Sequence, residues 1–270
     1  MREPQTNDEA AAMTVRARPS IKENHARLKL AQKPAKGAPL YSLMVNRPAG
    51  RALAAAAHRV GLTPNQVTLV SALFTLSGIA AVALLEPSFP AALIVTTALV
   101  IGYALDAADG QLARLRGGGS LTGEWLDHVI DAFKAATIHL AVLIMLYRMD
   151  VAEEWLVVPL VFAAAYVVEF FGMLLTDLLS RNAQLRLGKP APGPAKSSTL
   201  MSVMKLPTDY GVLCLSFLLL AVPVAFLWFY LLLAVANVAY TALVLIVWYR
   251  KLRVLDGEVS AQSNPGEADR

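Results

Sequence analysis

Long apolar stretches alternate with short polar connections between residues 67 and 249. A helix needs about 20 apolar residues to cross the hydrocarbon of a bilayer, so each stretch is long enough to span. The expected spans are residues 67–86, 91–110, 122–147, 155–180, 209–227 and 229–249. The last two are divided only by a short apolar segment around Pro223, which makes their boundary the least distinct. The pattern predicts an all-α, polytopic membrane protein with six transmembrane helices.

Composition agrees with this fold class. Of the 270 residues, 56% are hydrophobic and 16% are charged, and the mean hydropathy is +0.52. A soluble domain carries about 25% charged residues. The single cysteine, Cys214, lies in an apolar stretch, so a disulfide framework and a cysteine metal site are excluded. We expect membrane lipid, and no nucleic acid, as the partner of this chain.

The segments outside the spans differ in character. Residues 1–37 mix charged, polar, Ala and Pro residues without apolar periodicity, which predicts a disordered cytoplasmic tail. Residues 38–61 carry apolar residues among arginines, which is typical of an N-terminal amphipathic helix in the membrane interface. An ordinary basic juxtamembrane anchor is the alternative. We expect the membrane domain to cover residues 38–252 and a second cytoplasmic tail to follow at 253–270.

Basic residues are distributed unevenly among the connections, and this predicts the orientation. Positive charge in short loops favours the cytoplasmic side of a membrane. Lys and Arg gather in the N-terminal region, in the loops 111–121 and 181–207, and after residue 249, whereas the intervening connections lack a basic excess. The sequence therefore predicts a multi-pass protein of the cell membrane with both termini and the loop 111–121 in the cytoplasm.

Four aspartates stand where the second span ends and the third begins: Asp106, Asp109, Asp127 and Asp131. Ionisable residues at membrane depth are costly and indicate a functional site. The first two are three residues apart and the last two are four apart, so each pair shares one helix face. A glycine-rich connection lets the chain reverse, so an antiparallel helix pair brings the carboxylates together. Carboxylates suit Mg²⁺ or Mn²⁺, and four of them carry enough charge for two ions.

Small residues and one arginine accompany the aspartates. Gly110 and Ala113 leave room for a ligand to approach the backbone, and Gly123 opens the facing helix in the same way. Arg114 offers a bidentate donor for a phosphate beside the metals. Hard cations next to a phosphate-binding group indicate phosphoryl-transfer chemistry.

The spacing D-x2-D-G-x2-A-R-x8-G-x3-D-x3-D resembles the signature of the CDP-alcohol phosphotransferases, also called CDP-alcohol phosphatidyltransferases, and the resemblance covers about residues 38–250. It implies a metal-dependent enzyme of phospholipid biosynthesis. Such an enzyme moves a substituted phosphoryl group from a CDP-linked donor, such as CDP-diacylglycerol, to an alcohol acceptor and releases CMP. The family pattern implies that Asp106 and Asp127 bridge two metal ions, while Asp109 binds one ion and Asp131 the other. It also makes Asp131 the catalytic base.

The same resemblance implies contacts to the CDP donor. The residues implied in the signature region are Gly110, Ala113, Arg114, Ser120 and Gly123. The run from Leu62 to Thr68 resembles the family element T-P-[ND]-x-[VIL]-T and adds Asn65 and Thr68 as contacts to the cytidine. Thr63 and Pro64 in this run also suit a plain helix start.

Two side chains outside the signature are candidates for the acceptor pocket. Lys134 lies one turn beyond Asp131, where it either contacts an anionic acceptor or serves as the counter-ion of Asp131. Glu169 is an acidic residue deep in the fourth span. His128 is expected to pack at the interface, because it faces about 100° away from Asp127.

The acceptor itself stays open. The segment 123–131 resembles the G-E-x-x-D-H-x-x-D form of choline- and ethanolamine-phosphotransferases, whose acceptor is of the diacylglycerol type. Arg186, Lys189 and Lys196 favour instead an enzyme similar to phosphatidylinositol-phosphate synthases, with an anionic acceptor. A cation transporter is the non-enzymatic alternative, although its acidic residues belong near the bilayer midplane. A homodimer is compatible with the sequence.

Overall fold

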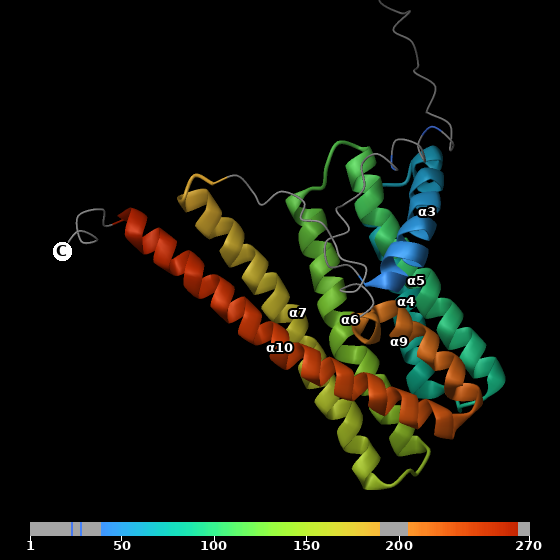
Figure 1. Cartoon of the computed structure of the whole chain (residues 1–270). Helices are drawn as coiled ribbons and strands as arrows, with labels where there is room; N and C mark the ends of the chain where they lie inside the picture. The colour runs from blue at the N-terminus through green and yellow to red at the C-terminus, as the bar shows by residue number, and fades with distance from the viewer. Residues whose placement is uncertain (1–22, 24–27, 29–38, 190–204, 264–270) are drawn as a thin grey trace, which may run out of the picture.

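The computed structural model describes residues 23, 28, 39–189 and 205–263, and nearly all of them are helical (Figure 1). The elements are η1 (Ser42–Asn46), α3 (Arg47–Val60), α4 (Pro64–Leu84), α5 (Phe89–Leu115), α6 (Leu121–Arg148), α7 (Glu153–Arg186), η2 (Leu206–Thr208), α9 (Tyr210–Ser216), η3 (Phe217–Ala221) and α10 (Pro223–Ser263). The described residues form no strand. The predicted all-α class is confirmed.

Among the described residues, five helices are long and apolar enough to cross a membrane, namely α4, α5, α6, α7 and α10. The predicted fifth span is shorter than expected, because α9 and η3 together cover only Tyr210–Ala221. Pro223 begins α10, which runs without a break to Ser263 and so includes the start of the predicted C-terminal tail. The protein is a multi-pass membrane protein. Apart from Glu23 and Leu28, the predicted N-terminal tail lies outside the described residues.

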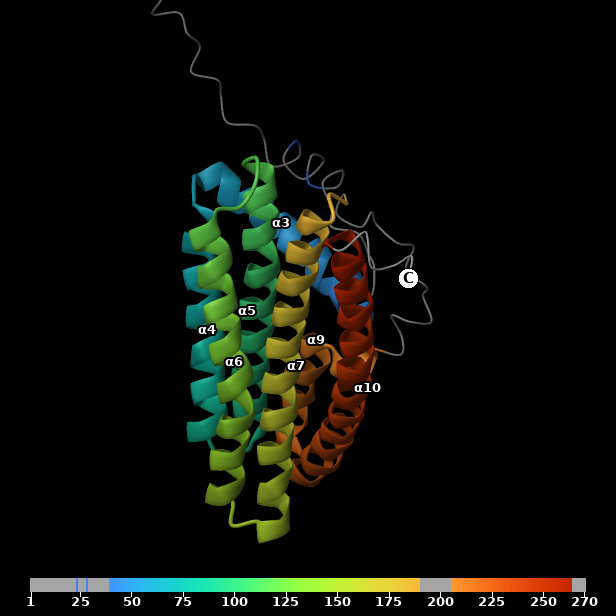
Figure 2. The ribbon, with the colours of Figure 1, turned by 90° about the vertical axis from the view of Figure 1, so that its left-hand side faces the viewer.

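The helices reverse direction at two opposite ends of the bundle. In Figure 1, α3 and the connection from α5 to α6 lie at the upper end, and the connection from α6 to α7 lies at the lower end. Figure 2 shows α4, α5, α6 and α7 running along the same axis, with α10 beyond α7. The start of α4, the connection from α5 to α6 and the C-terminal end of α7 therefore share one end of the molecule.

A tight turn joins the interfacial segment to the first span. Gly61 ends α3 with a left-handed backbone, φ 89°, which favours glycine. Thr63 then opens α4 with a capping box: its hydroxyl accepts from Gln66 N at 3.2 Å, and Gln66 Oε1 accepts from Thr63 N at 2.8 Å. Arg116, just after α5, donates to the carbonyls of Gly61 and Leu62 at 3.2 and 2.7 Å. These two hydrogen bonds fix the turn against the C-terminal end of α5.

Gly102 lets α5 approach α4 very closely. A Cβ at this position would collide with the Thr75 hydroxyl and would lie 3.2 Å from the carbonyl of Ser71. The Ser71 hydroxyl uses the same proximity and donates to Gly102 O at 2.8 Å. Because Gly102 lies one turn before Asp106, this contact sets the position of the motif helix relative to α4.

α3 packs on α5 in a similar way, and it does so along the motif. A Cβ at Gly50 would lie 2.8 Å from the Cβ of Ala107. A small apolar cluster continues the contact, formed by Leu28, Ala54, Ala57, Val67, Ala108, Leu112 and Leu115. The helix predicted for residues 38–61 is therefore present, and its small-residue face lies on the motif helix.

Asp209 ties the start of α9 to the residues before α3. Its Oδ2 accepts from Ser42 N at 3.0 Å and its Oδ1 accepts from Gly211 N at 2.9 Å. Burial raises the pKa of the Asp209 carboxyl, while these backbone N–H groups oppose that rise. The ring of Tyr41 lies where a Cβ of Gly211 would stand. The start of the interfacial segment is thus fixed beside α9.

We expect Gly102→Val to lower the free energy of unfolding by about 1–3 kcal/mol, since the added side chain must displace atoms of α4. Gly257→Val is the matched control, because a Cβ there meets open space on α10. Thermal unfolding of both variants in the same detergent measures the difference. Equal melting temperatures would contradict the close contact of α4 with α5.

Candidate active site

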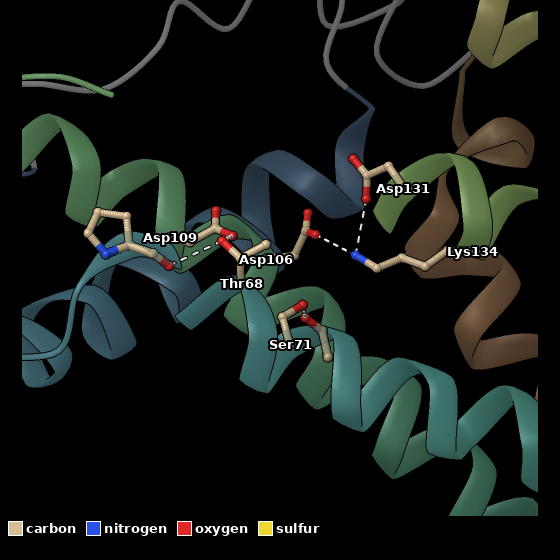
Figure 3. A network of polar contacts seen from close by, with 8 residues as sticks. Thr68, Ser71, Asp106, Asp109, Asp131 and Lys134 are labelled. Carbon is tan, nitrogen blue, oxygen red and sulfur yellow. Dashed lines mark hydrogen bonds and ion pairs between the residues drawn. The ribbon is translucent and has the colours of Figure 1, made fainter. Parts of the chain in front are cut away.

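Lys134 joins carboxylates from two helices. Its Nζ lies 2.6 Å from Asp106 Oδ1 on α5 and 3.0 Å from Asp131 Oδ1 on α6 (Figure 3). The Lys134 side chain is only 8% exposed, and an unpaired charge in such surroundings is costly. The geometry agrees with the counter-ion interpretation of Lys134. A contact of Lys134 to an anionic acceptor stays a prediction.

The two motif helices do not pack directly on each other, which differs from the antiparallel pair that we expected. α5 packs on α3 and α4, whereas α6 packs on α4 and α7. Within the described chain, α5 and α6 have almost no close backbone contact. Because α4 packs against both, it holds them apart, and the long Lys134 side chain bridges the separation. The aspartates of the two helices are therefore connected through side chains and not through a packed backbone seam.

Asp109 is held from α4. The carboxylate is 5% exposed, and its Oδ2 accepts a 2.6 Å hydrogen bond from the Thr68 hydroxyl (Figure 3). Asp106 and Asp127 lie within electrostatic range of it. Sequence reasoning gave Thr68 a cytidine contact and missed this bond. The sequence feature that could have indicated this bond is the hydroxyl group of Thr68, one helical turn inside an apolar span.

Asp127 and Asp131 have a third neighbour in His128. One ligand atom from each of the three residues lies within 4.8 Å of the other two. His128 is thus closer to the carboxylates than its helical angle suggested, because a long side chain can turn toward the neighbouring face. Its Nε2 also lies 3.9 Å from Glu124 Oε1.

Three of the residues predicted to bind the donor meet where α4 and α6 begin. A Cβ at Gly123 would lie 3.0 Å from Asn65 Oδ1 and 3.1 Å from Ser120 Oγ. The Ser120 hydroxyl caps α6 by accepting from Gly123 N at 3.0 Å. The absence of a side chain at Gly123 therefore leaves the Asn65 amide uncovered on this side. A hydrogen-bonding edge of this kind suits a nucleobase or sugar.

The other predicted donor residues follow Asp109 along α5. A Cβ at Gly110 would have Arg114 Nη1 as its nearest neighbour, at 3.7 Å, so the backbone there is open. Ala113 is half-buried one turn further. Within the described residues, Arg114 Nε is buried and has no hydrogen-bond partner. Asp109 lies within electrostatic range of Arg114. The strip offers room and a guanidinium for an anion.

Glu169 lies outside this group. Its Oε2 is 3.5 Å from the Thr241 hydroxyl, so it faces α10. Tyr166, one turn earlier on α7, lies within electrostatic range of both Glu169 and Asp131. The place of Glu169 in the acceptor pocket stays a prediction.

The donor set fits hard divalent cations. Asp106, Asp109, Asp127 and Asp131 supply carboxylate oxygens from two helices, and Mg²⁺ and Mn²⁺ prefer such ligands. A buried ammonium group already lies between two of the carboxylates, so the structure itself shows that this place favours positive charge.

Residues 61–236 match the family model described as CDP-alcohol phosphatidyltransferase, and this range contains the whole aspartate motif. The chain belongs to this family. The resemblance inferred from the motif is confirmed.

Individual members of the family resemble parts of the chain. An archaetidylinositol phosphate synthase from Pyrococcus horikoshii is 38% identical over 79 residues, which are 29% of this chain. The chain spans about two fifths (39%) of the length of this curated relative. A phosphatidylinositol phosphate synthase of Mycobacterium tuberculosis is 24% identical and covers 73% of this chain in two solved structures. The structure with CDP-DAG bound has a TM-score of 0.45 and 90% of its length matched, and the complex with manganese and citrate has 0.47 and 87%.

We expect Lys134→Met to make the protein more dependent on divalent cations. The substitution leaves Asp106 and Asp131 without their shared ammonium group, and the loss of one partner of a buried pair costs about 3 kcal/mol. The melting temperature in EDTA should fall, and added Mg²⁺ should raise it more than in the unsubstituted protein.

Lys189→Met is the control, because the pair of Lys189 with Glu258 is exposed and contributes little. A rise with Mg²⁺ in Lys134→Met no larger than in this control would contradict the role of Lys134 as a resident cation.

Proposed function

We propose that this protein transfers a substituted phosphoryl group from a CDP-linked donor to the hydroxyl group of an alcohol acceptor and releases CMP, as a step of phospholipid biosynthesis. The observation that carries the proposal is the convergence of carboxylates from α5 and α6 on Lys134. The strip at Gly110 and Arg114 lies on α5, the helix that also carries Asp106 and Asp109. Carboxylates that can bind metal ions and an arginine that can bind a phosphate beside an open backbone are parts that such a transfer needs.

The residues divide the chemistry among them. The acceptor oxygen forms a bond to the phosphorus attached to the lipid or head group, and the bond from this phosphorus to the CMP oxygen breaks. Asp131 takes the proton of the acceptor hydroxyl. Within the described residues, the contacts of Asp131 with Lys134 use Oδ1, which leaves Oδ2 to receive it. Arg114 holds the donor's phosphate, and Asn65 with Ser120 and Gly123 receives the nucleoside.

We propose two ions, Mg²⁺ or Mn²⁺, held by Asp106, Asp109, Asp127 and Asp131. Such ions, when bound, neutralise the diphosphate and stabilise CMP as the leaving group. Thr68 keeps Asp109 in a fixed orientation through the 2.6 Å hydrogen bond, so the carboxylate is positioned before any ligand arrives. A homodimer stays compatible with this site.

For the acceptor, we propose an inositol phosphate or a similar anionic alcohol, with a CDP-diacylglycerol type of donor. The name of the Pyrococcus relative supports this choice. The basic residues at the end of α7 give it less support than expected, because Lys189 pairs with Glu258 and Arg186 donates to Asn182. The aminoalcohol form of the motif makes diacylglycerol with a CDP-aminoalcohol the second candidate. CMP release with each donor and acceptor pair distinguishes the two.

We expect Asp131→Asn to lower turnover at least 100-fold while CDP binding in the presence of Mg²⁺ changes little, because the amide keeps the shape but accepts no proton. EDTA should abolish turnover of the unsubstituted protein. CMP release from purified protein in lipid measures both effects. Asp177→Asn, an exposed residue on α7, is the matched control and should keep full turnover. Near-normal turnover of Asp131→Asn would remove Asp131 as the base.

We also propose that the end of the bundle with the motif faces the cytoplasm, on the basis of its basic loops. Reporter fusions after Arg250 and within residues 181–207 should both read cytoplasmic. A fusion in the connection between α6 and α7, such as after Asp150, is the control and should read on the opposite side. A reversed pattern would place the site on the external face and contradict the proposal.

A further inference from the structure

The interfacial helix α3 contacts the motif helix at the level of the aspartates. Gln111 Nε2 donates to the backbone carbonyl of Arg47 at 3.0 Å, and Gly50 lies against Ala107. Ala107, Gln111 and Arg114 follow one another at intervals of four and three residues, so they lie on one face of α5. α3 therefore lies along the face of α5 that carries Arg114.

Arg47 brings a second guanidinium to this face. It lies within electrostatic range of Arg114 toward the end of α5 and of Tyr103 toward its middle. Asp106 and Asp109 are between these two positions in the sequence of the helix. Arg47 thus stands beside the stretch of α5 that supplies two carboxylates and the open backbone at Gly110.

Two guanidinium groups in a partly buried place repel each other. Both side chains are half-buried. Burial lowers the pKa of the Arg47 guanidinium, which means that its surroundings oppose the charge. An anion bound between the two guanidinium groups would turn this repulsion into attraction. Each guanidinium forms charge-assisted and often bidentate hydrogen bonds with phosphate.

We propose that Arg47 binds the diphosphate of the donor together with Arg114, so that the interfacial helix forms part of the donor site. This inference rests on the proposed function, which supplies a nucleoside diphosphate as the ligand. Asp106 contacts Lys134 of α6 and Asp109 contacts Thr68 of α4, whereas the two arginines lie on the side of α3. A diphosphate at Gly110 would then meet the positive charge of Arg47 and Arg114 on the side of α5 that lies against α3.

The alternative is that Arg47 serves only to dock α3. Its docking hydrogen bond uses the backbone carbonyl, which every substitution keeps. Arg47→Gln therefore removes the guanidinium and leaves the contact with Gln111. Arg59→Gln is the matched control, because Arg59 is an exposed arginine in the last turn of the same helix.

Equilibrium binding of CDP and of CMP, both with Mg²⁺, tests the proposal on purified protein in lipid. Arg47→Gln should weaken CDP binding about tenfold and CMP binding much less, because only CDP carries the second phosphate. Arg47→Lys keeps the charge but loses the bidentate geometry, so its loss should be intermediate. Arg59→Gln should leave both affinities unchanged, and the melting temperature of each variant checks that it is folded.

Combining Arg47→Gln with Arg114→Gln provides a second readout. If both side chains hold the same anion, the two losses in CDP affinity are not additive, and the double variant loses less than their product. Independent losses would indicate that Arg47 acts elsewhere.

Other outcomes separate this inference from the proposed function. Unchanged CDP affinity in Arg47→Gln, equal losses for CDP and CMP, or an equal loss in Arg59→Gln would overturn the role of Arg47 and leave the proposed transfer intact. An unsubstituted protein that binds neither nucleotide with Mg²⁺ would overturn both.

Discussion

Four carboxylates at the ends of two apolar helices are the constraint on which the rest of the structure depends. Like charges at this spacing repel one another, and burial raises the cost of each. Two neighbouring side chains offset this cost: Lys134 of α6 lies between Asp106 and Asp131, and Thr68 of α4 donates to Asp109. These neighbours stabilise the arrangement of carboxylates even in the absence of a bound cation.

The sequence predicted the helices and the motif because both depend on local pattern. Apolar length defined the spans, and intervals of three and four residues placed the aspartates on shared faces. The break between α9 and α10 was harder to predict, because residues on both sides of Pro223 are equally apolar. α9 and η3 together are short because Asp209 caps the start of α9 only 13 residues before Val222, which ends η3. Hydrophobicity alone does not predict where a tertiary hydrogen bond, such as that of Asp209 with Ser42, begins a helix.

The hydrogen bonds between segments that are distant in the sequence could not be predicted either. Thr68 and Asp109 are 41 residues apart, and no periodicity connects them. The separation of α5 from α6 arises because α4 packs on both, which is a property of three helices rather than of the motif. The interfacial pattern predicted a helix before the first span, but its contact with α5 depends on Gly50 meeting Ala107.

The contacts of α3 and α4 with α5 determine which faces of the motif helix are covered. α4 covers α5 through Gly102, and α3 covers another face through Gly50. By contrast, a Cβ at Gly110 would meet only Arg114 Nη1, at 3.7 Å, and the missing side chain at Gly123 leaves Asn65 uncovered. Glycines thus serve two opposite purposes here, since some bring helices into contact and others keep the facing surfaces free. Within the described residues, α3 and α4 thus cover two faces of α5 and leave the backbone at Gly110 open.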